Sequence, residues 1–340
     1  MFIRNAWYVA GLSEEFGQTL RAIKILNEEI VIYRITNGNP VALEDACPHR
    51  KLPLSMGVLE GDHVVCGYHG LTFDCSGKCV RAPTQKNAIP SRAVVNSYPV
   101  VDRWNFLWIW IGDPEMANPD DIYNIENFEN PAWGMTPFGS MNIACNYLYI
   151  MDNLLDPSHV AWVHRTSFAG TGTENQPLEI DVLNDGVIVW RWMMDRPPPS
   201  YYADLVSFEG NCDRKQHYEC RLPSLAINKS IFTLVGTGGP DKDLPKQAFV
   251  NISYNFMTPV DEDNSRYFWF QHRNQHPDNQ EISQKMFEGA MMAFEEDREI
   301  LERVHRGMKK SQGSKLNLGI DAGAIRFRKL LERRIGEDQT

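Results

Sequence analysis

The chain has 340 residues, which is enough for one large domain or two ordinary ones. Hydrophobic residues make up 43% of it, so it can bury a sizeable core, and its formal net charge is −10. That charge argues against nucleic acid or an anionic membrane surface as a partner. A small acidic substrate is still compatible with it, because a local basic pocket can exist in an acidic protein.

The first third of the chain is expected to be rich in β-strands. Runs of β-branched and aromatic residues are separated there by Gly, Asn and Pro, which favour turns. The predicted strands cover residues 29–35, 40–43, 64–66 and 107–111. The composition changes near residues 112–114 and in the acidic stretch 120–129, so we predict a domain of residues 1–115 followed by one of residues 116–340.

The second domain is expected to be mixed, with strands and helices. A helical pattern covers residues 147–164, strands are predicted at 187–194, 248–257 and 266–271, and a long helix at 283–310 precedes a basic tail. In the strand at 248–257 the polar residues Asn251, Ser253 and Asn255 share one face. The fold class that follows is α+β with two β-dominated domains.

The cysteines are better explained as metal ligands than as disulfides. There are seven, an odd number spread unevenly over a long chain, which fits a disulfide scaffold poorly. The first residues lack the apolar segment of a signal peptide, and no apolar run approaches the ~18 residues that a membrane span needs. We therefore expect a reducing, cytoplasmic location.

Two Cys and two His form the first candidate site. Cys47 and His49 make a Cys-x-His pair, Cys66 and His69 make a Cys-x-x-His pair, and sixteen residues separate the pairs. Thiolates on one iron and neutral imidazoles on the other would suit a 2Fe–2S cluster of raised reduction potential. A Cys₂His₂ zinc site is the main alternative, and unrelated residues are a weaker one.

The flanking residues resemble the Rieske motif closely. This resemblance favours the 2Fe–2S cluster over zinc, and the nearby Cys75 and Cys79, which fit neither ligand position, are expected to be structural. The resemblance rests on Cys47-Pro48-His49-Arg50, Pro53-Leu54-Ser55, Cys66-Gly67-Tyr68-His69-Gly70, Phe73-Asp74 and Gly77-Lys78.

The second candidate site combines two His with an Asp. Pro157 predicts that one helix ends near Leu155 and that a new segment, with Asp156 at its N-cap, carries His159. His159 and His164 are five positions apart, about 140° around an ideal helix, so both can face one metal only if the helix ends or bulges between them. From the spacing alone, each could equally be an ordinary surface or core histidine.

Asp297 has independent support from the pattern of the long helix. It lies in an otherwise apolar stripe, where a carboxylate needs a cation or a donor as partner. A salt bridge to arginine and coordination of iron by two His and one carboxylate are both possible explanations. The other members of the stripe are Phe287, Ala290, Phe294, Leu301, Val304 and Met308.

The spacing of these residues looks like the catalytic motif of Rieske non-haem iron oxygenases. The resemblance implies that His159, His164 and Asp297 bind a mononuclear Fe(II). It implies that Asp156 relays electrons from His69 of a neighbouring subunit to His159, and that Asn153 lies near the iron. Asn228 and Asn255 correspond roughly to substrate-pocket positions.

Further sequence similarity narrows the branch of the family. The chain resembles the group of vanillate O-demethylase, dicamba monooxygenase and toluenesulfonate monooxygenase oxygenase components, through the segments 4–10, 106–110, 267–269 with 273–274, and 294–297. The resemblance implies an N-terminal all-β Rieske domain and a C-terminal helix-grip domain, an antiparallel sheet wrapped around a long helix. It also implies a head-to-tail homotrimer.

The implied function is that of a terminal monooxygenase. O₂ is the co-substrate, and NADH electrons arrive through a separate reductase or ferredoxin, since the chain has no flavin or nicotinamide motif. The substrate would be a small, aromatic acid that is hydroxylated or O-demethylated. Alternatives are a non-aromatic or N-methyl substrate, a Rieske electron carrier, and a zinc-stabilised ligand-binding protein.

Overall fold

The computed structural model describes residues 2–85, 88–169, 173 and 175–337. It divides into two compact units, one of Met1–Asn124 with Thr258–Asp261 and one of Ile125–Met257 with Glu262–Thr340. Among the described residues, no helix is both long and apolar enough to cross a membrane.

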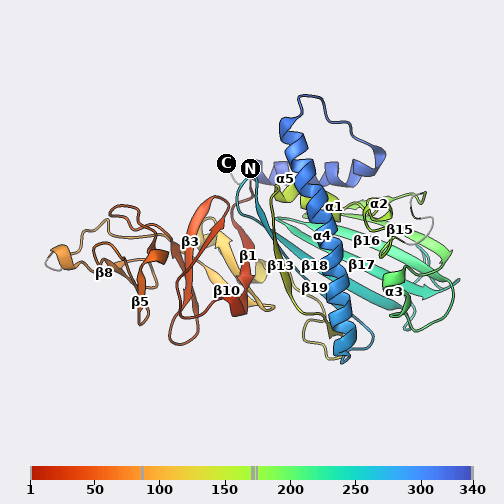
Figure 1. Ribbon diagram of the computed structural model, residues 1–340, viewed down its shortest axis with the longest axis horizontal. Helices are drawn as coiled ribbons and strands as arrows, with labels where there is room; N and C mark the ends of the chain where they lie inside the picture. Colours follow the sequence, from red (N-terminus) through yellow and green to blue (C-terminus); the bar gives the residue numbers. More distant parts are fainter. Residues whose placement is uncertain (1, 86–87, 170–172, 174, 338–340) are drawn as a thin grey trace. The chain divides into compact units, whose positions relative to one another are not determined.

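The first unit is built from three antiparallel sheets, which agrees with the predicted all-β domain (Figure 1). Its three-stranded sheet has the order β1-β11-β10, and its four-stranded sheets have the orders β2-β3-β4-β9 and β5-β6-β7-β8. The strands are β1 (Ala6–Leu12), β2 (Arg21–Ile25), β3 (Glu28–Arg34), β4 (Pro40–Glu44), β5 (Val58–Glu60), β6 (His63–Val65), β7 (Thr72–Phe73), β8 (Cys79–Arg81), β9 (Ser97–Tyr98), β10 (Val100–Arg103) and β11 (Phe106–Ile111). Each strand predicted for this region is present, to within a residue at either end.

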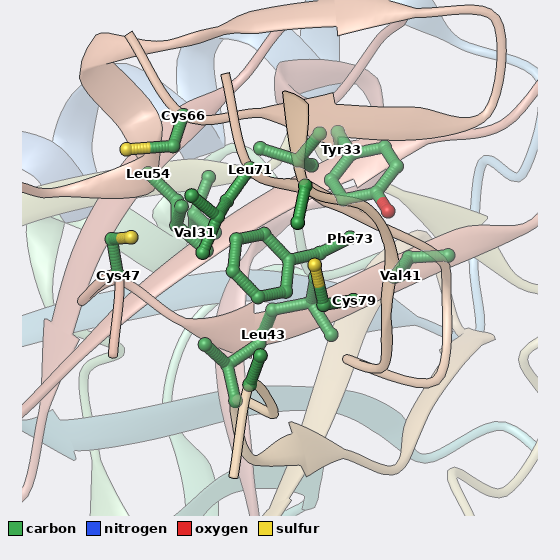
Figure 2. Packing of buried hydrophobic residues seen from close by; sticks show 14 residues of the cluster. Val31, Tyr33, Val41, Leu43, Cys47, Leu54, Cys66, Leu71, Phe73 and Cys79 are labelled. Carbon is green, nitrogen blue, oxygen red and sulfur yellow. The ribbon is translucent and has the colours of Figure 1, made fainter. Parts of the chain in front are cut away.

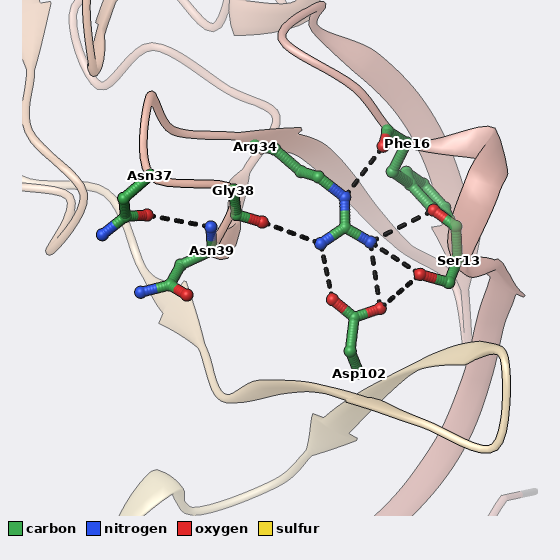
Figure 3. A network of polar contacts seen from close by, with 7 residues as sticks. All are labelled: Ser13, Phe16, Arg34, Asn37, Gly38, Asn39 and Asp102. Carbon is green, nitrogen blue, oxygen red and sulfur yellow. Dashed lines mark hydrogen bonds and ion pairs between the residues drawn. The ribbon is translucent and has the colours of Figure 1, made fainter.

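Arg34, at the end of β3, ties three segments of this unit together (Figure 3). Its guanidinium forms an ion pair with Asp102 of β10 at 2.5 Å and donates to the carbonyls of Phe16 and Gly38 at 2.9 Å each. It also donates to the hydroxyl of Ser13 at 2.9 Å. Burial alone would raise the pKa of Asp102, but hydrogen bonds from Arg34 and Ser13 lower it below its ordinary value.

Replacing Arg34 with methionine is expected to lower the free energy of unfolding by about 2 kcal/mol, because several charge-assisted hydrogen bonds are lost together. The pKa of Asp102 is lowered on folding, so its contribution is present above the unfolded pKa of about 4 and is lost as the pH falls further. Urea unfolding should therefore show a smaller difference in the free energy of unfolding between the wild type and Arg34→Met at pH 3 than at pH 7. Arg81→Met, which removes an exposed pair with Glu60, should change little at either pH.

The second unit contains an eight-stranded antiparallel sheet with helices against it. The strand order is β12-β19-β18-β17-β16-β15-β14, and β13 also pairs with β19. In Figure 1 the long helix α4 crosses one face of this sheet, as the helix-grip prediction requires. The strands are β12 (Gly134–Met135), β13 (Gly139–Ile143), β14 (Glu179–Val182), β15 (Gly186–Arg196), β16 (Cys212–Arg221), β17 (Leu225–Leu234), β18 (Phe249–Pro259) and β19 (Ser265–Arg273), and the helices are α1 (Tyr147–Leu154), α2 (Val160–Val163), α3 (Ser200–Ala203), α4 (Gln280–Lys310) and α5 (Ala322–Glu337).

Several features of this unit differ from the sequence prediction. Strands β12, β13 and β14 and the central strands β16 and β17 were not predicted, and the supposed basic tail forms helix α5, which packs on β15. In α4, Ala290, Asp297 and Leu301 are buried as predicted, but Val304 and Met308 are exposed. The last turns of α4 instead bury His305, whose ring packs on Tyr149 of α1 with centroids 5.5 Å apart.

Candidate metal centres

Two loops of the first unit bring the predicted cluster ligands together. Cys47 and His49 follow β4, and Cys66 and His69 lie between β6 and β7. In each loop the cysteine N–H donates to the carbonyl five residues later, over 2.9 Å and 2.8 Å, and the cysteine carbonyl accepts from the N–H four residues later. The two loops therefore share the same pattern of backbone hydrogen bonds, although the histidine follows the cysteine by two residues in one loop and by three in the other.

The cysteines lie inside this unit and the histidines at its surface. Cys47 and Cys66 are almost fully buried at one edge of a hydrophobic cluster that includes Leu54 (Figure 2). The Nδ1 atoms of His49 and His69 are only 3.2 Å apart, and the His49 side chain is exposed. Two buried sulfurs and two neighbouring imidazoles at the surface fit a cluster with one Cys-bound and one His-bound iron.

Burial opposes ionisation of the Cys47 thiol while no metal is bound. Burial, with the adjacent Cys66 thiol, raises the pKa of Cys47 to about 11, while the backbone N–H groups of His49 and Arg50 act in the opposite direction. Without metal this cysteine is a neutral thiol at pH 7, so loading a cluster must displace its proton. The N–H groups directed at the sulfur would then stabilise the thiolate.

Cys75 and Cys79 are close in sequence but take no part in this arrangement. Cys79 belongs to the hydrophobic cluster and Cys75 packs against it. Their sulfurs lie 3.5 Å from the carbonyl of Asp62 and 3.3 Å from that of Arg81, respectively. Both are packed in the way that a structural role requires.

In the second unit, His159, His164 and Asp297 form a compact group. One ligand atom from each lies within 4.8 Å of the others. The Nε2 atoms of His159 and His164 are 3.7 Å and 3.2 Å from the same Oδ1 of Asp297. That oxygen is buried and has no hydrogen-bond partner among the described residues, as expected for an atom that awaits a cation.

The local backbone explains how histidines five residues apart can face one metal. Helix α1 ends at Leu154, and α2 is a single turn with His164 at its C-cap. Its N-cap is His159, so the prediction of Asp156 at this position was wrong. His164 has left the helical conformation, with φ −104° and ψ 43°. The helix therefore ends between the two ligands, which was one of the two geometries that the sequence allowed.

Glu296 holds His164 in place and was not recognised in the sequence. Its carboxylate accepts from Nδ1 of His164 at 2.7 Å, which leaves Nε2 directed at Asp297. Burial alone would lower the pKa of His164, but Asp297 and Glu296 raise it above its ordinary value. An orienting carboxylate behind a metal-binding imidazole is a common feature of metal sites.

Asp156 and Asn153 precede His159 in the chain, and their contacts are local. The carboxylate of Asp156 accepts from the N–H of Ser158 at 2.8 Å and from its hydroxyl, which closes the turn after Pro157. His159 contacts the backbone carbonyl of Asp156, at 2.5 Å from Nδ1, and not its carboxylate. Nδ2 of Asn153 is buried, and no described residue accepts a hydrogen bond from it.

The three metal-binding candidates line a cavity of about 600 Å³, counting its open mouth. Its walls come from α1, α2, α4 and the inner face of the sheet, and Asn251 and Ser253 face it, as the pattern of β18 suggested. Asn228 also lines it, while donating to the carbonyl of Leu154 at 2.8 Å. Asn255 lies behind, donating to Oδ1 of Asn228 at 3.1 Å.

Two family models match the chain, one for each unit. The Rieske 2Fe–2S domain matches residues 6–99, and the vanillate O-demethylase oxygenase C-terminal domain matches residues 143–337. Together they cover both groups of candidate ligands.

Full-length relatives agree with both matches. The chain is 38% identical to the iron-sulfur subunit TsaM1 of a toluene-4-sulfonate monooxygenase system from Comamonas testosteroni, over 98% of this chain and 97% of that one. It is 33% identical to a vanillate O-demethylase oxygenase subunit from Pseudomonas sp. (strain HR199 / DSM 7063), over 100% and 96%.

The solved structures of dicamba monooxygenase have the same fold. Its complex with 3,6-dichlorosalicylic acid superposes with a TM-score of 0.90 at 29% identity, covering 100% of this chain and 99% of that one. Another structure of it, with non-heme iron and dicamba, superposes with a TM-score of 0.80 at 27% identity, covering 99% and 98%.

Proposed function

Since this chain belongs to the family of Rieske oxygenase components with a vanillate O-demethylase-type C-terminal domain, we propose that it is the terminal monooxygenase of a multicomponent system. The proposed substrate is a small aromatic acid, which it hydroxylates or O-demethylates. The observation that carries the proposal is the convergence of His159, His164 and Asp297 in the wall of a cavity. Residues 1–115 would form the Rieske domain and residues 116–340 the catalytic domain.

The residues of the chain have distinct roles in this proposal. Cys47, His49, Cys66 and His69 would hold the 2Fe–2S cluster. His159, His164 and Asp297 would hold Fe(II), which supplies the activation of O₂ for attack on a C–H bond. With only three protein ligands, the ion would keep coordination positions for other groups, and the cavity would give them access. In a methyl ether, hydroxylation of the methyl group gives a hemiacetal that collapses to formaldehyde and a phenol.

The proposed assembly is a head-to-tail homotrimer served by a separate reductase or ferredoxin. The relatives are subunits or components of larger systems, which supports a separate electron donor. In the trimer, Asp156 would connect a neighbouring subunit's cluster to His159. We place the protein in the cytoplasm, and its seven unpaired cysteines support a reducing compartment.

Within the cavity, the apolar side chains of Val160 and Phe294 would exclude water around the substrate, and Asn228 would offer it a polar contact. Asn255 would act through Asn228 by fixing the orientation of its amide. Asn153 would lie near the iron.

Glu296→Gln is expected to weaken binding of the mononuclear metal about 10-fold, because the imidazole of His164 loses its charged orienting partner. Titration of the iron-depleted site with Fe(II) or Co(II) under anaerobic conditions measures this directly. Glu299→Gln, three positions along the same helix, removes an exposed carboxylate paired with Arg303 and serves as the control. Unchanged metal affinity in Glu296→Gln would contradict the orienting role.

Oxygen uptake tests the proposed reaction. Protein loaded with cluster and iron, then chemically reduced so that no reductase is needed, is mixed with O₂ and a panel of methoxylated and methylated aromatic acids. We expect single-turnover oxygen consumption with at least one acid, together with a hydroxylated or demethylated product. Consumption that is independent of substrate, or no product from any acid, would contradict the proposal.

A further inference from the structure

Arg214 of β16 lines the same cavity as the metal-binding group, and no carboxylate among the described residues balances its charge. The side chain is 4% exposed, so its guanidinium is effectively out of water. A buried charge of this kind is costly unless it is paired. The groups around it therefore decide whether it is part of the scaffold or part of a binding site.

Within the described part of the chain, Arg214 contacts neutral groups. Its terminal nitrogens donate to the carbonyls of Ala169 and Phe168, each at 3.2 Å. Its guanidinium carbon lies 5.9 Å from the ring centroid of Tyr202 and 5.5 Å from that of Phe232. Carbonyls and aromatic faces partly stabilise a cation but do not neutralise it.

No carboxylate in the described part of the chain pairs with Arg214. Its neighbour Asp213 points to the other face of the strand, where it accepts from the N–H groups of Asp195, Gly236 and Gly238. Asp297 lies in the same cavity, but it belongs to the metal-binding group. Burial accordingly lowers the pKa of Arg214 from its ordinary value.

Arg214 also has donors to spare. A guanidinium carries five N–H bonds, and the Nε–H of Arg214 is buried with no acceptor among the described residues. Nε and a terminal nitrogen together form the fork that binds a carboxylate or sulfonate through two parallel hydrogen bonds. The site thus has both the charge and the geometry for an oxyanion.

We infer that Arg214 binds the anionic group of the substrate and makes this oxygenase selective for aromatic carboxylates or sulfonates over neutral aromatic compounds. The part of this inference that concerns selectivity of the oxygenase rests on the proposed monooxygenase function. Binding of the anion at the sheet would direct the rest of the molecule across the cavity toward His159, His164 and Asp297. The aromatic rings of Phe168 and Tyr202, which line the cavity, would pack on the substrate ring.

The test compares acids with neutral amides of the same shape. Calorimetric titrations are made anaerobically on the fully loaded protein, with toluene-4-sulfonate and 4-methylbenzoate as acids and with their amides as neutral probes. For the wild type we expect each acid to bind at least about 10-fold more tightly than its amide. Arg214→Gln should lose about 100-fold in affinity for the acids and little for the amides.

Two further variants keep the result interpretable. Arg214→Lys keeps the charge but lacks the planar fork, so it should recover only part of the affinity for the acids. Lys215→Gln removes the same charge from the next residue, which stacks on Trp190 and does not line the cavity. It should bind acids like the wild type.

The inference is overturned if the wild type binds acids no better than amides, or if Arg214→Gln keeps its affinity for the acids. If Arg214→Gln fails to fold, the affinities of the wild type and of Arg214→Lys for acids and amides still test the inference. Oxygen uptake separates the two proposals. Turnover of neutral compounds that does not change when Arg214 is replaced would contradict this inference alone. Tight binding of acids without turnover would contradict the proposed monooxygenase function.

Discussion

Asp297→Asn is expected to release the mononuclear iron while the Rieske cluster stays in place. The amide cannot supply the negative charge that Fe(II) requires from its third protein ligand. Iron should fall from about three to about two atoms per chain with sulfide unchanged, and turnover should fall by at least about 1000-fold, since O₂ activation depends on the metal.

The stability of the iron-free protein provides a second readout for this variant. The Oδ1 atom of Asp297 is buried without a hydrogen-bond partner among the described residues. At alkaline pH, where His164 is neutral and does not pair with it, removing the charge should not lower the melting temperature of the iron-free protein. With iron present, only the wild type should be stabilised, because the metal binds the folded state. Glu295→Gln is the matched control. It lies two positions before Asp297 and removes an exposed carboxylate that pairs with Arg298. Full iron content in Asp297→Asn would show that Asp297 is not a ligand.

Asp156→Asn is expected to keep both metal sites and lose nearly all steady-state turnover. Asparagine can still accept from Ser158, so the turn that positions His159 should persist. What it lacks is the negative charge that a relay between two metal-bound imidazoles would use. We expect a fall of at least about 100-fold, with iron, sulfide and the spectrum of the cluster unchanged.

A pre-steady-state experiment distinguishes a relay from a structural role. After the cluster is reduced and mixed with substrate and O₂, the wild type should re-oxidise its cluster within one turnover, whereas Asp156→Asn should leave it reduced. Ser158→Ala removes the hydroxyl that donates to Asp156 but leaves the charge of the carboxylate, so this variant should retain electron transfer. Normal re-oxidation in Asp156→Asn would exclude the relay.

The parts of the site that the sequence could predict are those fixed by local spacing. The Cys-x-His and Cys-x-x-His pairs lie in single loops, so their flanking residues already indicate the geometry that the structure has. Asp297 was visible because the regular period of a helix exposes a charge placed in an apolar stripe. Pro157 likewise predicted that the first helix ends before His159, while the end of α2 between the two histidines was one of two geometries that their spacing allowed.

The parts that the sequence could not predict depend on tertiary contacts. Strand β16 carries polar residues on both faces, because its inner face lines the cavity, so its pattern does not show the alternation of an ordinary strand. Glu296 and Arg214 are charged residues typical of a surface, and only the packing of α4 and the sheet reveals what they contact. The last turns of α4 direct His305 toward Tyr149 of α1 and leave Val304 and Met308 exposed, which is where the predicted stripe fails.

The central claim is that one chain holds a Rieske cluster and a mononuclear iron, and elemental analysis tests it most directly. Protein purified anaerobically is assayed for iron, zinc and acid-labile sulfide. We predict brown protein with about three iron atoms and about two sulfides per chain, and no stoichiometric zinc. Zinc without sulfide would contradict the whole account, and two iron atoms without a third would indicate an electron carrier in place of an oxygenase.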